Sequence, residues 1–90
     1  MNKAKLVEEV SSKTRLTKEN IRNIIDATTK TIKNALSKGE RVTLVDFGTF
    51  LVIRKKARRG RNPQTREELQ IPARKVPKFR AGKALREKIK

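Results

Sequence analysis

The residues most able to do chemistry in this sequence form a dense run of cations between positions 54 and 66. Seven of those thirteen residues are Lys or Arg, and none is acidic. A loop that is merely solvated usually mixes the two signs of charge, whereas a run of one sign repels itself unless a polyanion neutralises it. The run therefore indicates a polyanionic ligand.

The charge of the whole chain supports the same interpretation. The 90 residues include 25 Lys and Arg but only nine Asp and Glu, which gives a net charge of +16 and a pI near 11.3. The half after residue 45 holds fifteen of the cations and four of the acidic residues. Such clustering is typical of proteins that bind nucleic acid. A ribosome-like RNA-binding protein and a basic face for acidic lipid remain as alternatives.

Residue types argue against catalysis. The chain has no His and no Cys, so it lacks the commonest general base, the commonest metal ligand and any thiolate. The acidic pairs Glu8–Glu9 and Glu67–Glu68 are adjacent in sequence, and neighbours on a helix or strand do not face one substrate. Without His or Cys the chain offers no nucleophile–base pair, although Lys and Ser are not formally excluded as nucleophiles. We expect no enzymatic activity, no metal, no cofactor and no small-molecule substrate.

The sequence shows no membrane or export signal. No apolar run approaches the ~18 residues of a membrane span, and the first residues contain no apolar core of a signal peptide. We therefore expect a reducing compartment and no membrane partner. The initial Met without a transit segment favours the bacterial cytoplasm, while a plastid or virus-encoded origin stays open.

Periodicity predicts two helices in the first part of the chain. Residues 3–14 place Leu6, Val7 and Val10 on one face after a possible N-cap at Asn2. Residues 18–38 form a longer amphipathic pattern that Thr17 would cap and Gly39 would end. The short connection between them predicts a helical hairpin.

Extended segments and a short helix are expected after Gly39. The second strand is apolar on both faces and should be covered on both. Pro72 has no N–H, which predicts a bend or an edge there. These expected elements are strands at 41–45, 50–53 and 67–76, turns at 46–49 and 62–65, and a helix at 82–89.

Residues 54–74 are interpreted as a β-hairpin with its tip at Pro63. A two-stranded ribbon buries too little surface to be rigid alone, but its shape can follow a DNA groove. A hairpin centred on Pro63–Gln64 would place Arg59 opposite Glu68. Pro63 itself is either an ordinary turn residue with a fixed φ or an apolar wedge between base pairs.

The apolar content, 34% of residues, is low for a free-standing domain and suggests that a second chain completes the core. Phe47, Phe50 and Phe79 are the only aromatic residues. They lie among apolar neighbours, which favours a core role. No aromatic platform is then left for stacking bases, and this argues against single-stranded ligands.

Several segments resemble the bacterial histone-like DNA-binding family, which includes HU and integration host factor, and the likeness to the HU branch is stronger. The resemblance covers essentially the whole chain without gaps. Its motifs are Gly60-Arg61-Asn62-Pro63-Gln64-Thr65, Asp46-Phe47-Gly48-Thr49-Phe50, Ile71-Pro72-Ala73-Arg74-Lys75-Val76-Pro77-Lys78-Phe79 and Gly82-Lys83-Ala84-Leu85.

The resemblance implies an α+β fold in an intertwined dimer, with a helical hairpin, a three-stranded antiparallel sheet, a protruding β-ribbon arm and a short C-terminal helix. The single domain would span 1–90. Its parts would be a helical dimer base at 1–39, a sheet saddle at 40–53 and 74–81, a flexible DNA-binding arm at 54–73 and a C-terminal helix at 82–90.

The resemblance also implies a function: largely non-specific binding of double-stranded DNA through the minor groove, with bending and compaction of the nucleoid and a preference for nicked or distorted DNA. Pro63 would intercalate, and Phe47, Phe50 and Phe79 would form the dimer core. The implied DNA-binding residues are Lys3, Lys55, Arg58, Arg59, Arg61, Asn62, Pro63, Gln64, Thr65, Arg66, Arg74, Lys75, Arg80, Lys83 and Arg86.

Three positions depart from the pattern common in that family. Arg66 and Asp46 stand where Gly is common, and Ile53 stands where a basic residue is common. The partner chain is expected to be a second copy, with a paralogue as the alternative. A sequence-specific subunit akin to integration host factor also stays open.

Overall fold

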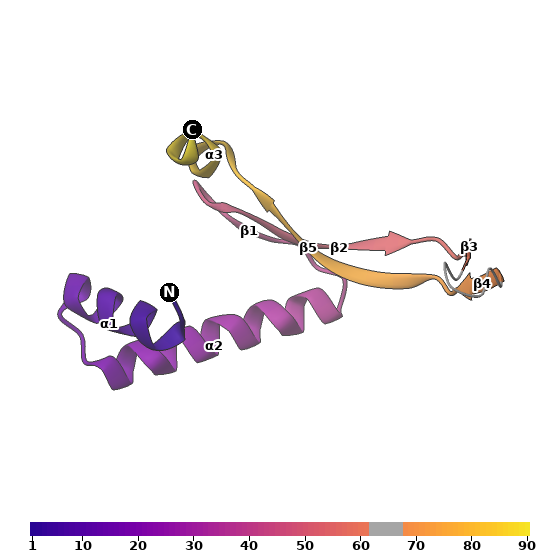
Figure 1. Ribbon diagram of the computed structural model, residues 1–90. Helices are drawn as coiled ribbons and strands as arrows, with labels where there is room; N and C mark the ends of the chain where they lie inside the picture. Colours follow the sequence, from indigo (N-terminus) through magenta and orange to yellow (C-terminus); the bar gives the residue numbers. More distant parts are fainter. Residues whose placement is uncertain (62–67) are drawn as a thin grey trace. The chain divides into compact units, whose positions relative to one another are not determined.

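The computed structural model describes residues 1–61 and 68–90, and the expected arm tip at 62–67 lies outside the described residues. The chain divides into two compact units, residues 1–34 and 35–90. Helices make up the first unit, and strands with a short closing helix make up most of the second (Figure 1). The predicted α+β class is confirmed.

The first unit is the predicted helical hairpin. α1 (Lys3–Thr14) begins where the Asn2 side chain accepts a hydrogen bond from the N–H of Lys5, and α2 (Lys18–Ser37) begins where Thr17 Oγ1 accepts from the N–H of Asn20. Both predicted caps are thus confirmed. Val7 and Ile21 are the buried apolar side chains of this unit.

Gly39 ends α2 as expected. Its φ is +79°, in the left-handed region that glycine adopts without strain. Its N–H donates to the carbonyl of Leu36, and the N–H of Glu40 donates to the carbonyl of Ala35. These two bonds form a Schellman motif, which satisfies carbonyls that the helix end would otherwise leave unpaired.

The second unit contains the predicted three-stranded antiparallel sheet. β1 (Val42–Leu44), β2 (Gly48–Lys55) and β5 (Arg74–Ala81) lie in the order β1-β2-β5. β2 starts two residues earlier than predicted, so the turn is shorter. The short helix α3 (Lys83–Ile89) follows β5 and lies within the predicted range.

β3 (Arg58–Arg61) and β4 (Glu68–Ile71) pair as a separate two-stranded ribbon. One continuous extended segment at 67–76 was predicted, but the strands break at Pro72 and Ala73, and β5 then runs on to Ala81. The break is the one expected of a residue with no N–H for the ladder.

The predicted pairing of Arg59 with Glu68 is wrong. Arg59 lies opposite Gln70, and Glu68 lies opposite Arg61. The sheet explains the difference. Its last pair is Lys55 of β2 with Arg74 of β5, residues 56–57 and 72–73 are unpaired, and the β3–β4 pairing then begins with Arg58 opposite Ile71. The ribbon therefore inherits its register from the sheet and is not set by a turn centred on Pro63–Gln64.

Candidate nucleic-acid interface

Strand alternation gathers four cations on one face of the sheet. Successive side chains of a strand point to opposite faces, so Arg74, Lys78 and Arg80 of β5 share a face, and the register adds Lys55 opposite Arg74. All four are exposed, and neither β2 nor β5 contains an acidic residue. We call this the cationic face. Its charges are arranged to meet phosphates.

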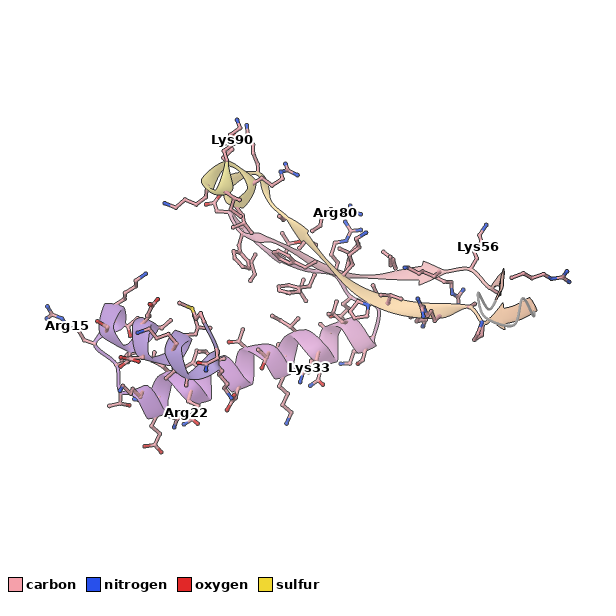
Figure 2. The ribbon with its side chains drawn as sticks, viewed as in Figure 1. Arg15, Arg22, Lys33, Lys56, Arg80 and Lys90 are labelled. Carbon is pink, nitrogen blue, oxygen red and sulfur yellow. The ribbon has the colours of Figure 1, made fainter. Side chains whose placement is uncertain are left out.

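Lys78 belongs to this face although it was missing from the predicted site. The signal that could have found it is its spacing of two residues from Arg80 in an extended segment. Lys75, which was predicted to bind DNA, falls by the same alternation on the opposite face with Arg54. Figure 2 shows the side chains of Arg80 and of Lys56, the residue after β2, projecting away from the backbone.

The opposite face of the sheet carries the aromatic side chains. Phe50 lies directly across from Phe79, with ring centroids 4.9 Å apart, and the ring of Phe47 lies 5.4 Å from that of Phe79. The expected aromatic cluster is therefore present. Phe47 and Phe79 remain 45% and 39% exposed in the single chain. A cluster of this kind that stays partly open has apolar surface to offer to another chain.

Gly48, at the start of β2, allows the ring of Phe79 to pack directly against the backbone. A Cβ atom at this position would lie 2.5 Å from two ring carbons of Phe79 and 2.7 Å from the carbonyl oxygen of Arg80. Both distances are far below van der Waals contact. The glycine is thus needed at the point where β2 meets Phe79.

The described part of the arm places basic residues on β3. Arg58, Arg59 and Arg61 lie on this strand, with Gly60 between them. Its partner β4 carries Glu68. The predicted tip residues Asn62, Pro63, Gln64, Thr65 and Arg66 lie outside the described residues, so their DNA-binding role stays a prediction.

In the helical unit, the predicted DNA-binding residue Lys3 is engaged by an acidic neighbour. Its ammonium group donates to Asp26 Oδ1 at 2.5 Å, which ties the start of α1 to the middle of α2. Both side chains are more than half exposed. A phosphate that binds Lys3 must therefore compete with this carboxylate.

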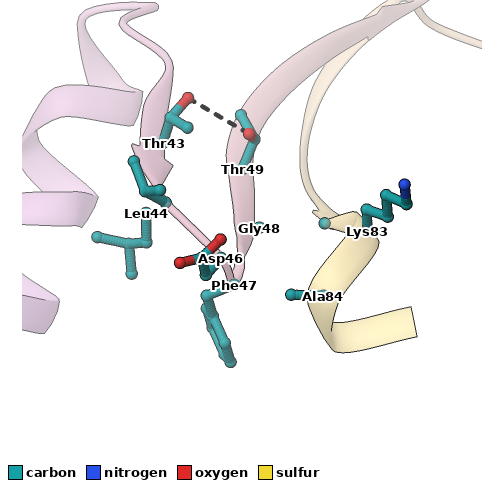
Figure 3. Close-up of a pocket in the computed structure, with 10 residues that line it drawn as sticks. Thr43, Leu44, Asp46, Phe47, Gly48, Thr49, Lys83 and Ala84 are labelled. Carbon is teal, nitrogen blue, oxygen red and sulfur yellow. Dashed lines mark hydrogen bonds between the residues drawn. The ribbon is translucent and has the colours of Figure 1, made fainter. Parts of the chain in front are cut away.

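Lys83 and Arg86 lie on α3, and both are exposed. A hollow of about 300 Å³ lies between the β1–β2 turn and the start of this helix. Figure 3 shows the Lys83 side chain extending away from Asp46, which lines the same hollow. The Lys83 ammonium therefore stays accessible to an anion outside the molecule.

The β1–β2 turn explains one departure from the family pattern. Asp46 adopts a φ of +68°, in the left-handed region where glycine is the least strained residue. Asp is among the few other residues that tolerate this conformation. The N–H of Phe47 donates to the carbonyl of Leu44 to close the turn. Asp46 thus keeps the turn that a glycine would make.

Within residues 1–61 and 68–90, no group of three or more Asp, Glu, His or Cys side chains is placed to hold a metal ion. Over the same residues, neither of the longer helices nor α3 combines the length and apolar character needed to cross a bilayer.

Comparison with known proteins gives consistent results. The model of a family described as "Bacterial DNA-binding protein" matches residues 1–90. The curated "DNA-binding protein HU" of Staphylococcus aureus (strain COL) is 49% identical over 90 residues, which cover both chains completely. The protein of that name from Nostoc is 48% identical over 89 residues, covering 99% of this chain and 95% of its own.

Solved structures show the same likeness. The structure titled "Anabaena HU-DNA cocrystal structure" superposes with a TM-score of 0.93 at 48% identity, covering 99% of this chain and 97% of the other. HU from Thermotoga maritima superposes with a TM-score of 0.74 at 37% identity, over all of both chains.

Proposed function

Because this chain belongs to the bacterial DNA-binding protein family, we propose that it is a histone-like architectural protein of the nucleoid. It binds double-stranded DNA with little sequence specificity, through the minor groove, and holds the duplex bent. HU and integration host factor are among the known architectural proteins that bind the minor groove.

The cationic face is the observation that carries this proposal. Lys55, Arg74, Lys78 and Arg80 are exposed on one side of two strands that contain no acidic residue. Such a surface gains affinity by releasing the cations condensed on DNA. Phosphates carry no sequence information, so contacts from these four cations support weak sequence specificity.

The exposed apolar surface supports a homodimer as the binding unit. Among the described residues, only Val7, Ile21 and Leu51 are buried hydrophobic side chains, while Ile24, Phe47 and Phe79 are 51%, 45% and 39% exposed. A core this small does not stabilise a chain of 90 residues. A second copy packed on the aromatic cluster would cover Phe47 and Phe79, and the pair of chains would present two arms to one duplex.

Bending is proposed to come from the arm tips. Pro63 would insert between base pairs and unstack them, and the cations of the arm and α3 would hold the flanking DNA. Smooth bending of a 20–30 bp site costs about 1–6 kcal/mol. A nick removes part of that cost, so nicked DNA should bind more tightly than intact DNA.

The test is the affinity for intact and nicked duplexes of one sequence, measured by fluorescence anisotropy at several salt concentrations. If the dimer neutralises about ten phosphates, log K falls with log salt at a slope of about −9. The nicked duplex binds more tightly at every concentration. A slope near zero, or tighter binding to an A-form RNA duplex, would contradict the proposal.

A further inference from the structure

The cationic face is interrupted by an apolar patch. Leu51 and Ile53 of β2 and Val76 of β5 lie on the same face as Lys78, because Ile53 pairs with Val76 and Leu51 pairs with Lys78. Leu51 is only 7% exposed, while Ile53 and Val76 are partly exposed. Leu51 thus forms the floor of the patch, and the two β-branched side chains form its accessible edge.

Cations border this patch at both ends. Lys55 and Arg74 form a cross-strand pair on the side of the arm, and Arg80 lies opposite Thr49 beyond Lys78 on the other side. A surface that only tracked phosphates would gain from further cations in the middle. The apolar interruption fits a ligand that has anionic edges and a less polar strip between them.

The minor groove of duplex DNA has this chemistry. Two rows of phosphates flank a floor of base edges and sugar walls. All four base pairs present acceptor atoms there, and G·C pairs alone add a donor, the guanine 2-amino group. An apolar side chain placed on that amino group prevents it from binding water and offers no acceptor in return.

We infer that the apolar patch formed by Leu51, Ile53 and Val76 contacts the minor groove and disfavours base pairs that carry the guanine 2-amino group. This inference rests on the proposed function and adds a specificity determinant to it. The acceptor atoms are common to every base pair, so covering them costs the same for each sequence. The difference in affinity between sequences therefore comes from the guanine 2-amino group.

A purely structural role for the patch is the competing explanation. β-branched residues that face each other across two strands stabilise the pair, and Ile53 with Val76 would do so at the root of the arm. That role predicts a change in stability when either residue is altered but no change in the preference among duplexes. A ratio of affinities therefore separates the two explanations.

The experiment compares three duplexes that differ only in a central block of A·T, G·C or inosine·C pairs. Inosine lacks the 2-amino group, so its minor groove resembles that of A·T. The A·T and inosine·C duplexes should bind about five-fold more tightly than the G·C duplex, the lower end of what one unpaired donor costs. Equal affinities for the three duplexes would overturn the inference while leaving the proposed function intact. Failure to bind any of them would contradict the proposed function itself.

Three variants test whether the patch causes the preference. Ile53→Thr keeps the β-branch and adds a hydroxyl that accepts a hydrogen bond from the guanine 2-amino group. The ratio of the affinity for the A·T duplex to that for the G·C duplex should therefore fall toward one. Ile53→Val keeps the side chain apolar and should retain the ratio. Val45→Thr makes the same kind of change at an 86% exposed position in the β1–β2 turn, away from the patch, and is the matched control. A ratio unchanged in Ile53→Thr would assign the preference to DNA stiffness and overturn the inference.

Discussion

At the scale of single residues, two backbone positions carry strain or crowding that substitution would reveal. Arg15 ends α1 with a φ of +61°, in the left-handed region, and its N–H donates to the carbonyl of Ser11. Gly48 sits against Phe79 with no room for a side chain. Glycine at position 15 should therefore stabilise the fold, whereas replacing Gly48 should destabilise it.

Arg15→Gly should raise the free energy of unfolding by about 1 kcal/mol, because glycine adopts the left-handed conformation without a steric penalty. Lys13→Gly is the matched control. It removes the same charge from the last turn of α1, where glycine costs about 1 kcal/mol relative to Ala. Denaturant melts at one protein concentration measure both. A lower stability in Arg15→Gly would contradict the account of this cap.

Gly48→Ala should lower the free energy of unfolding by more than about 2 kcal/mol, since the added methyl overlaps the Phe79 ring and the Arg80 carbonyl. Gly39→Ala is a useful comparison. Its positive φ also disfavours Ala, but no heavy atom lies within 4 Å of the added Cβ. Thermal melts should rank Gly48→Ala as the more damaging change, and the reverse order would argue against close packing at β2.

At the scale of elements, the ion pair between α1 and α2 limits how freely Lys3 meets DNA. Asp26→Asn should change stability by less than about 1 kcal/mol, because the pair is exposed. Affinity for duplex DNA should rise, because Lys3 no longer has a carboxylate partner. The control is Glu8→Gln, which removes an equal charge from the looser Lys5–Glu8 pair at 3.9 Å. Equal gains in both variants would show a general charge effect instead.

The arm is the element in which the proposed wedge can be tested. Pro63→Ala should change affinity for a linear duplex only modestly but reduce its bending, because unstacking is lost while the phosphate contacts remain. Energy transfer between dyes on the two ends of the duplex measures the bend. Gln64→Ala, at the neighbouring predicted tip residue, serves as the comparison. An undiminished bend in Pro63→Ala would assign that proline to the turn alone.

Local chemistry made the helices predictable, while pairing across the chain made parts of the sheet unpredictable. Asn2, Thr17 and Gly39 act through bonds to residues within a few positions, so their caps could be inferred from sequence. The partner of Arg59 depends on a register set from Lys55 onward, which no local pattern encodes. Lys78 was missed for a different reason: its two-residue spacing from Arg80 is a local signal, but the predicted strand ended at residue 76, whereas β5 runs on to Ala81.

At the scale of the whole molecule, one chain leaves both of its binding surfaces incomplete. The aromatic cluster offers apolar surface with no cover in the described chain, and the cationic face gathers like charges that nothing within β2 or β5 neutralises. A second copy would cover the first surface, and DNA would neutralise the second. In the proposed complex, the second copy and the DNA would thus contact different surfaces of the same sheet.

The most direct test of this account is energy transfer across an end-labelled duplex of about 30 bp, titrated with the protein while anisotropy reports the bound fraction. Energy transfer should rise with binding and reach its plateau at two chains per duplex. A fully bound duplex whose ends stay as far apart as in free DNA, or a plateau at one chain per duplex, would contradict it.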